Sequence, residues 1–401
     1  MHLAHIYLEQ FRCYTRQELE LPPAGIRLAG SNASGKTSFV EAIQLLSMMK
    51  SARASVEREL INWESNAEFG LPPFARIQGW AEGAVDVNSI EIILTADANR
   101  PNHTKKQIKL DGQPTRSIDA VGRLKTVLFE PEDMDLVLGS PSVRRRYLDV
   151  AISTLDSTYL RILSQYNKIL EQRNSLLKSF RDQDRSTRSA RSGELDYWDS
   201  ELINRAAYIV AARLRFLDQA RDPLARSFQA LLGEEHELRV DYQLATRLDE
   251  SGSERDINVQ DFTGLQRQIS QRLQHEIENR RAEEFSRGVT AVGPHRDDLM
   301  FLLDGRDIES FGSRGQQRLA VVSVKLAEVD VIQQVSGQTA VLLLDDVLSE
   351  LDERRQQRLL ELVGALGGQV VVTATDARLI QVEQLEQLPL YHVDSGQINA
   401  V

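Results

Sequence analysis

Apolar and polar positions alternate through much of the first 130 residues, which predicts strands with few helices. Short runs centred on Ile26 and Leu28, and longer ones at Ile90–Thr95 and Gln107–Leu110, fit strands, and residues 110–114 carry the Asp-Gly and Pro signals of a turn. One helix interrupts this region. Its apolar positions recur at helical spacing and are Phe39, Val40, Ile43, Leu45, Leu46 and Met49.

The period changes after Pro141 to alternating steps of four and three, the pattern of a heptad seam. The seam comprises Leu148, Ile152, Leu155, Tyr159, Ile162, Tyr166 and Ile169. A second helical stripe, from Trp198 to Phe216, is predicted to end near Pro223. The polar stretch Arg181–Gly193 between the stripes predicts a solvated loop, and therefore a helical hairpin. Leu265, Ile269, Leu273 and Ile277 predict a further helix.

Strand patterns return near the C-terminus. Leu299–Leu303 predicts one strand, and Ala340–Leu344 is an apolar run typical of a buried parallel strand. Residues 369–375, Gln-Val-Val-Val-Thr-Ala-Thr, predict another core strand. The order of these patterns indicates an α/β core with a helical segment inserted into it.

Composition adds exclusions. Hydrophobic residues make up 41% of the 401 residues and charged residues 27%, which is ordinary for a globular chain. No apolar run approaches the ~20 residues that a membrane helix needs, and the first residues lack a secretory signal pattern. The single cysteine, Cys13, excludes an internal disulfide, is expected to be a small packed residue, and suggests a reducing cytoplasm. We assign no structural metal.

The net charge of −11 by itself argues against binding to nucleic acid, but the distribution of charge along the chain does not. Residues 141–290 carry 24 basic and 24 acidic residues, so the rest of the chain holds the whole deficit. Within Arg161–Arg191, eight basic residues stand against three acidic ones. Because screening limits repulsion to about 8 Å, such a strip can contact DNA phosphates. The residues we favour for DNA contact are Lys178, Arg181, Arg185 and Arg188.

Residues 30–37 match the phosphate-loop pattern G-x-x-x-x-G-K-[ST], between a predicted strand and a predicted helix. In such a loop backbone N–H groups surround phosphate oxygens, Lys36 supplies a cation to the β- and γ-phosphates, and Thr37 a hydroxyl to Mg²⁺. The candidate nucleotide-binding residues are Gly30, Ser31, Asn32, Ala33, Ser34, Gly35, Lys36, Thr37 and Ser38.

A carboxylate partner follows far downstream, at the end of the apolar strand Ala340–Leu344. Asp345 would hold Mg²⁺ together with Thr37, directly or through water. Asp346 would position or deprotonate an attacking water, which makes Asp346 and Lys36 the candidate catalytic residues. A long separation between Thr37 and Asp345 means that a large segment is inserted into a nucleotide-binding core.

Several further motifs carry a family resemblance. Phe311–Gln317 (Phe-Gly-Ser-Arg-Gly-Gln-Gln) resembles the signature of ABC-class ATPases, and Leu344–Asp352 resembles their Walker B and D-loop arrangement. Together with Gly293–Leu299, Leu8–Tyr14 and Phe129–Met134, they are similar to the RecF family of bacterial recombinational repair ATPases. The resemblance spans essentially the full chain, with the motifs in the family's order.

The resemblance implies an ABC/SMC-like P-loop ATPase head with an inserted helical arm. The expected parts are an ATPase core at 1–135, the arm at 136–290, and the rest of the core at 291–401. In the family two ATP molecules with Mg²⁺ are sandwiched in a homodimer, each between one subunit's loop and the other's signature. The signature residues here are Ser313, Arg314, Gly315 and Gln316, with Asp352 in the D-loop.

The resemblance also implies a biological role. RecF-like proteins bind double-stranded DNA and gap junctions in an ATP-dependent way, act with RecO and RecR to load recombinase, and hydrolyse ATP slowly, stimulated by DNA, as a timer for release. The associated processes are DNA repair, recombination, replication and the SOS response to DNA damage. The expected location is the cytoplasm, without membrane contact.

Some residues depart from the ATPase pattern or leave alternatives open. Asp346 stands where typical ABC ATPases have glutamate, and no histidine occupies Thr373–Asp376. Arg53 resembles an arginine of SMC-like heads, although a surface arginine is the preferred interpretation. For His295 and its neighbours we favour a hydrogen-bonded loop that braces the signature helix over direct catalysis, with a metal site a third choice.

Three other functions compete with this one. A transporter's nucleotide-binding subunit would need closer motifs and no basic hairpin. A nuclease fusion would need more than the 49 residues that follow Asp352. An ATP-locked DNA clamp with negligible turnover differs from a slow ATPase only in the rate of phosphate release.

Overall fold

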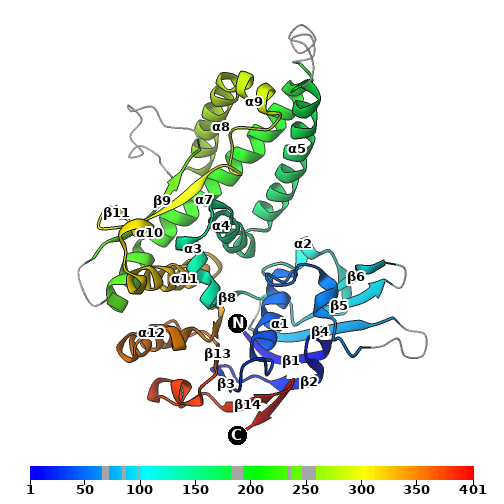
Figure 1. The fold of residues 1–401 in the computed structure, drawn as a ribbon, viewed down its shortest axis with the longest axis vertical. Helices are drawn as coiled ribbons and strands as arrows, with labels where there is room; N and C mark the ends of the chain where they lie inside the picture. Colours follow the sequence, from blue (N-terminus) through cyan, green and yellow to red (C-terminus); the bar gives the residue numbers. More distant parts are fainter. Residues whose placement is uncertain (66–71, 84–86, 98–99, 182–192, 233–235, 246–258) are drawn as a thin grey trace. The chain divides into compact units, whose positions relative to one another are not determined.

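The computed structural model describes residues 1–65, 72–83, 87–97, 100–181, 193–232, 236–245 and 259–401. These residues form two compact units (Figure 1). The first unit contains residues 1–134, 223–236 and 314–401, and the second contains 135–222 and 237–313. No helix among the described residues is both long enough and apolar enough to cross a membrane.

The first unit contains two six-stranded sheets. An antiparallel sheet has the order β2-β1-β4-β5-β6-β7, and a mostly parallel sheet has the order β15-β14-β3-β13-β12-β8. The antiparallel strands are β1 (His2–Phe11), β2 (Tyr14–Glu20), β4 (Phe74–Glu82), β5 (Ser89–Asp97), β6 (Arg100–Leu110) and β7 (Gln113–Thr115). The other strands are β3 (Gly25–Ala29), β8 (Thr126–Phe129), β12 (Val341–Asp345), β13 (Val370–Ala374), β14 (Leu390–Asp394) and β15 (Gln397–Ala400).

Burial along these strands explains the two sequence patterns. β4 alternates buried and half-buried residues, because one face of the antiparallel sheet packs on the core. β12 and β13 are buried at every position, as expected for parallel strands covered on both faces. The apolar residues of both sheets and of the first helix form one hydrophobic cluster, so the two sheets share a core.

Helices and short 3-10 turns complete the first unit. They are α1 (Lys36–Met48), η1 (Glu57–Leu60), α2 (Ser117–Ala120), η2 (Pro131–Met134), α11 (Arg314–Ser336), η4 (Val347–Glu350), α12 (Glu353–Ala365), η5 (Ala377–Ile380) and η6 (Glu383–Leu385). The strands predicted at 90–95, 107–110, 340–344 and 369–375 and the helix that follows the phosphate loop are confirmed.

The second unit is mainly helical and includes a small sheet of order β11-β10-β9. Its elements are α3 (Asp135–Leu138), α4 (Pro141–Leu155), α5 (Ser157–Arg181), most of α7 (Glu194–Leu232), β9 (Leu238–Gln243), α8 (Phe262–Asn279), α9 (Arg281–Arg287), β10 (Asp298–Leu303), β11 (Arg306–Asp307) and α10 (Ile308–Phe311). The four apolar residues predicted to mark the helix now called α8 are all buried, which confirms that helix.

The heptad seam is real, but it does not belong to one helix. α4 ends at Leu155 and α5 begins at Ser157, with Asp156 in extended conformation between them. The pattern continues across the break because both helices pack against the same core. One turn beyond the last predicted position, the seam reaches Arg173, whose side chain is completely buried. Our inclusion of Arg173 among the basic residues of a DNA-facing strip was therefore wrong.

Pro223 lies inside α7 and does not end it, which corrects the sequence prediction. The helix continues to Leu232 because Leu224, Phe228 and Leu231 are buried at helical spacing beyond the proline. Burying each of these side chains is worth about 1.5–3 kcal/mol, which together exceeds the roughly 3 kcal/mol cost of a proline within a helix.

The division into units differs from the predicted domain limits in two places. Residues 223–236 group with the first unit, although they were predicted to belong to the arm, and residues 291–313 group with the second unit, although they were predicted to belong to the core. The second difference follows from the pairing of β10 with β9, which attaches Asp298–Leu303 to the helical unit. The first boundary, after Met134, falls one residue before the predicted limit at 135.

Candidate functional site

The phosphate-loop residues 30–37 connect β3 to α1, the predicted strand–loop–helix arrangement. Two glycines are required by the geometry. A Cβ on Gly30 would lie 2.3 Å from the Val393 carbonyl oxygen, and Gly35 has a φ of 121°, which disfavours any other residue. The loop is braced by Tyr14, whose hydroxyl donates to the Gly35 carbonyl at 2.9 Å. The loop is followed directly by the N-terminus of α1, a geometry that favours the binding of anions.

Lys36 turns back over the loop. Its ammonium donates to the carbonyl oxygens of Gly30 and Ser31, each at 2.8 Å, and its side chain is largely buried. Burial lowers the pKa of Lys36, while the nearby Asp346 and Asp345 oppose that shift. An ammonium so placed is poorly hydrated, which favours its pairing with an anion that enters the loop.

Asp345 ends β12, between β13 and β8 in the parallel sheet. Its Oδ1 accepts hydrogen bonds from the hydroxyls of Thr37 at 3.2 Å and Thr373 at 2.8 Å. Residues 308 positions apart thus meet because the carboxyl ends of β3 and β12 lie at one edge of the sheet. The predicted pair Thr37 and Asp345 is brought together as the sequence motifs require.

Asp346 adopts a left-handed backbone with φ of 56°, held by a hydrogen bond from its N–H to the Thr373 hydroxyl at 3.1 Å. Its Oδ1 is shielded from solvent and has no hydrogen-bond partner within the described part of the chain. Burial raises the pKa of Asp346, and the charges of Asp345 and Glu350 add to the rise, against the Thr375 backbone and Lys36. A higher pKa makes Asp346 a stronger base than an ordinary aspartate.

These groups surround a cavity of about 310 Å³. It is lined by Cys13, Asn32, Ala33, Ser34, Gly35, Lys36, Thr37, Ser38, Asp345, Asp346 and Thr375. Besides the Asp346 oxygen, the buried Ser34 hydroxyl has no hydrogen-bond partner in the residues that the structure describes. The Ser34 hydroxyl, the Lys36 ammonium and the helix N-terminus can all donate to a phosphate ligand, whereas the Asp346 oxygen can accept from a water. One carboxylate and one hydroxyl fit Mg²⁺, which takes few protein ligands and completes its shell with phosphate and water.

Cys13 is not the packed residue expected from the sequence. It is exposed and lines the cavity, and a Cβ on Gly35 would lie only 2.9 Å from its sulfur. The expectation failed because nothing in the residues next to Cys13 in the sequence indicates that the turn between β1 and β2 lies against the phosphate loop. Burial of the sulfur still raises the pKa of the Cys13 thiol.

Arg53 is the site residue whose surroundings the sequence interpretation missed. Its Nη2 donates to Glu130 Oε2 at 2.7 Å and to Asp345 Oδ2 at 3.1 Å, so the preferred interpretation as a surface arginine was wrong. Burial would lower the pKa of Arg53, but Glu130 and Asp345 outweigh it and raise the pKa. Glu130 was also overlooked. The available signal was its position within Phe129–Met134, one of the motifs that carry the family resemblance.

The signature residues lie at the start of α11. Ser313 and Arg314 are exposed, and Gly315 and Gln316 are half-buried. Among the described residues that line the phosphate-loop cavity, Arg314, Gly315 and Gln316 are not included. Asp352 has a structural task, since its side chain caps α12 by accepting from the Arg355 N–H at 3.0 Å. Neither finding tests the predicted roles across a dimer.

Of the residues proposed to contact DNA, Lys178 and Arg181 lie exposed in the last turn of α5. Arg185 and Arg188 lie outside the described residues. Positive charge at the C-terminal end of a helix also complements the helix dipole, so these two residues have a local structural benefit as well.

The His295 loop belongs to the second unit and braces it. Tyr166 and the His295 Nδ1 are 2.5 Å apart, and Asp297 accepts from the Tyr242 hydroxyl at 2.7 Å. Burial lowers the pKa of His295 to about 4, so the ring is neutral near pH 7. These contacts confirm a hydrogen-bonded loop, but they join it to residues of the second unit, so bracing of the signature helix stays a prediction. Within the described ranges, no cluster of three or more His, Cys, Asp or Glu side chains could hold a metal ion.

Comparison with known proteins adds a family to this geometry. The family model of the RecF/RecN/SMC N terminal domain matches residues 2–398. The chain is 42% identical over 391 residues to the DNA replication and repair protein RecF of Thermomicrobium roseum, covering 98% of each chain. It is 36% identical to the RecF of Bacillus subtilis, over 99% of this chain and all of the relative.

Solved structures agree with the sequence relatives. A structure of the recombination mediator protein RecF with ATP, in the RecFOR pathway, matches with a TM-score of 0.80 at 28% identity, covering 100% of this chain and 97% of that one. An Smc head domain from Pyrococcus furiosus matches with a TM-score of 0.54 at 16% identity, covering 100% of this chain and 96% of that one. The second match shows a shared fold alone. The predicted α/β class with an ABC/SMC-like ATPase head is confirmed.

Proposed function

The chain belongs to the RecF family, and from that premise we propose that it is an ATP-dependent DNA-binding protein of recombinational repair and replication. The observation that carries the proposal is the assembled phosphate site, in which a buried Lys36 covers the loop and Thr37 meets Asp345. The relatives' name and the ATP-bound structure of the related protein support it.

In this proposal residues 30–38 bind ATP. Lys36 leaves the loop carbonyls for the β- and γ-phosphates, and the N–H groups at the start of α1 donate to phosphate oxygens. Thr37 and Asp345 would hold Mg²⁺, which neutralises charge on the phosphates. Asp346, whose pKa is raised and whose Oδ1 has no partner among the residues that the structure describes, orients a water for attack and accepts its proton.

We propose further that ATP brings two copies together. Ser313, Arg314, Gly315 and Gln316 of one copy would meet the γ-phosphate held by the other, with Asp352 in the neighbouring D-loop. The exposure of Ser313 and Arg314, and the absence of residues 314–316 from the lining of their own cavity in the described chain, support contacts made in trans.

The remaining parts of the proposal follow the family. The protein would bind duplex DNA and gap junctions as an ATP-bound dimer in the cytoplasm, and would act with RecO- and RecR-type proteins to load recombinase after DNA damage. DNA-stimulated hydrolysis would be slow and would end the bound state. Phosphate release measured with and without DNA distinguishes this ATPase from a clamp without turnover.

The first experiment tests nucleotide binding at the cavity itself. Cys13 is the chain's single cysteine and lines the cavity, so bound ATP and Mg²⁺ should protect it from alkylation. Lys36→Ala should lose both ATP binding and this protection, because the phosphates would lack their cation. Lys105→Ala, an exposed position on β6, is the matched control and should behave like the parent. Equal alkylation of the parent with and without ATP would place the nucleotide elsewhere.

A further inference from the structure

Arg53 lies between two carboxylates that belong to neighbouring strands. One nitrogen, Nη2, contacts both Glu130 Oε2 at 2.7 Å and Asp345 Oδ2 at 3.1 Å. A third carboxylate, Glu132, lies 3.9 Å away and is mostly exposed. Asp345 is nearly inaccessible, with 3% of its side chain exposed. A single guanidinium therefore serves as the shared counter-ion of two acidic groups that face each other.

The sheet brings the two carboxylates together. β8 pairs in parallel with β12, and Phe129 stands opposite Leu344, so Glu130 and Asp345 emerge side by side at the carboxyl ends. Arg53 approaches from the segment after α1. Its backbone is fixed by the Ser51 hydroxyl, which accepts from the N–H of Arg53 at 3.0 Å and of Ala54 at 2.9 Å.

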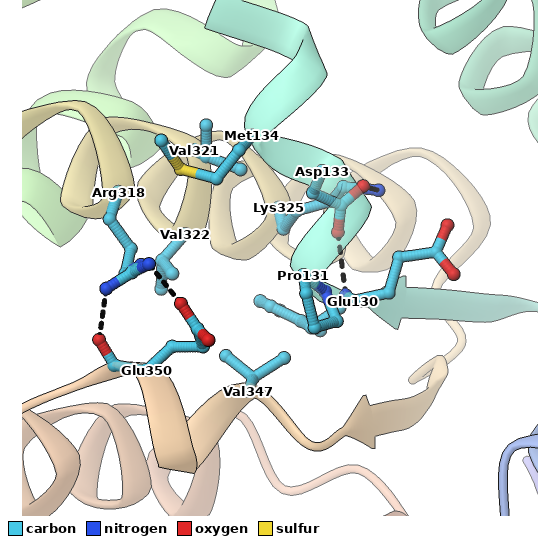
Figure 2. A pocket seen from close by; sticks show the side chains of 11 residues that line it. Glu130, Pro131, Asp133, Met134, Arg318, Val321, Val322, Lys325, Val347 and Glu350 are labelled. Atoms are coloured by element: carbon cyan, nitrogen blue, oxygen red, sulfur yellow. Dashed lines mark hydrogen bonds and ion pairs between the residues drawn. The ribbon is translucent and has the colours of Figure 1, made fainter. Parts of the chain in front are cut away.

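Glu130 is held in place from the opposite side. Asp133 accepts from the Glu130 N–H at 2.9 Å and from the Lys325 ammonium at 2.8 Å. Figure 2 shows Asp133 between Lys325 of α11 and the backbone of Glu130. Lys325 is itself buried, so the loss of Asp133 would leave a buried ammonium without this partner. The backbone of Glu130 is thus connected to α11 through Asp133, while its carboxylate contacts Arg53 at 2.7 Å.

The two oxygens of Asp345 face different partners. Oδ1 faces the hydroxyls of Thr37 and Thr373, whereas Oδ2 faces Arg53. A divalent cation held by Thr37 and Asp345 would lie within a few ångströms of the guanidinium. Two cations on one buried carboxylate repel each other strongly, because little solvent screens them.

We propose that Arg53 competes with Mg²⁺ for the Asp345 carboxylate, and that Glu130 is the second carboxylate to which Arg53 stays bound when the metal takes Asp345. The inference rests on the proposed function, since it takes Asp345 as a metal ligand. Arg53 and Glu130 are positioning residues here: they set how readily the metal binds without touching the reacting atoms. Through Asp133, the backbone of Glu130 is also connected to Lys325 of α11, the helix that begins with the signature.

The proposal can be tested by measuring how tightly the full chain binds Mn²⁺ in the absence of nucleotide. The electron paramagnetic resonance signal of free Mn²⁺ reports how much of the metal remains unbound. Arg53→Gln removes the competing cation and should tighten Mn²⁺ binding about tenfold, the effect of losing one charge-assisted contact. Glu130→Gln should weaken binding, because Arg53 then pairs with Asp345 alone and a nearby negative charge is lost. Arg116→Gln, an exposed arginine of the same unit, is the control and should match the parent.

The opposite directions expected for the two variants exclude a general loss of structure as the cause. If Arg53→Gln binds Mn²⁺ no more tightly than the parent while Asp345→Asn abolishes binding, the competition is refuted and the metal site stands. If Asp345→Asn binds Mn²⁺ as the parent does, the metal assignment in the proposed function fails, and the competition fails with it.

Discussion

At the scale of a single residue, Asp346 combines an unusual backbone conformation with a buried, unpartnered oxygen in the described part of the chain. Its backbone is left-handed, and the Thr373 hydroxyl accepts from its N–H. Its Oδ1 is shielded from solvent and unpartnered among the described residues. The aspartate is one methylene shorter than the glutamate of typical ABC ATPases, and the position of the backbone decides where its carboxylate lies.

We predict that Asp346→Asn slows ATP hydrolysis while preserving or prolonging the ATP-bound dimer, because an amide cannot accept the proton of the attacking water. The base acts only when deprotonated, and its pKa is raised from 3.8. The acidic limb of the parent's hydrolysis rate should therefore lie at higher pH than that of an ordinary aspartate, and Asp346→Asn should lose that limb. Single-turnover phosphate release measured across pH gives the position of the acidic limb in the parent and its loss in the variant. A normal rate in Asp346→Asn would show that Asp346 has no role in hydrolysis.

At the scale of elements, a buried charge network connects α5 to other segments of the second unit, beside its apolar seam. Arg173 donates to Asp199 of α7 at 2.8 Å, to Glu284 of α9 at 2.6 Å and to Thr290 at 2.8 Å. In Figure 1 these three helices lie together in the second unit. The network joins segments that are far apart in the sequence.

We predict that Arg173→Ala destabilises the second unit by about 3–5 kcal/mol, the usual cost of leaving buried carboxylates without their cation. Lys168→Ala, an exposed position on the same helix, should change stability by no more than about 0.5 kcal/mol. Urea unfolding followed by fluorescence and circular dichroism compares them. Equal stabilities of the two variants would mean that the network contributes little beyond its packing.

The start of α11 is the element that the dimer proposal depends on. Ser313→Arg should leave ATP binding to one subunit intact and prevent ATP-dependent dimerisation, because a large cation would occupy the space that the partner's γ-phosphate needs. Sedimentation with a slowly hydrolysed ATP analogue measures the effect. A normal dimer would show that residues 311–317 are a polar helix start without a role in trans.

At the scale of the whole molecule, the acidic net charge coexists with a basic strip near the end of α5. Because Arg173 is buried, it does not belong to that strip. The proposed DNA contacts are therefore Lys178 and Arg181, which are exposed, and Arg185 and Arg188, which lie outside the described residues. The Lys178 and Arg181 side chains lie off the buried seam, so they can be changed without disturbing the core.

We predict that replacing Lys178, Arg181, Arg185 and Arg188 by glutamine weakens DNA binding for every sequence tested and leaves ATP binding unchanged. Each lost phosphate contact should flatten the slope of log affinity against log salt by about 0.9 on duplex DNA. The double variant Lys105→Gln and Arg116→Gln controls for net charge when it is compared with the double variant Lys178→Gln and Arg181→Gln, since each removes two exposed positive charges. Parent-like affinity and slope in the quadruple variant would move the DNA surface to the ATPase unit.

The sequence alone determined the local parts of this protein. Residues 30–37, the apolar strand before Asp345 and the α8 stripe each carry their signal within a short window, since backbone conformation and burial of one face follow from neighbouring residues. The family also followed from the sequence, because several motifs stand in a fixed order. The comparisons confirm that resemblance.

Only the tertiary structure decided which distant residues meet. Arg53 joins Glu130 and Asp345, Arg173 is buried, and Pro223 lies within a continuous helix. Residue type predicts the opposite in the last two cases, since arginine is usually exposed and proline usually ends helices. The outcome depends on carboxylates and apolar side chains supplied by segments far away in the chain. Their contribution appears only when the chain has folded, because the energy of a charge or a proline depends on the partners that surround it.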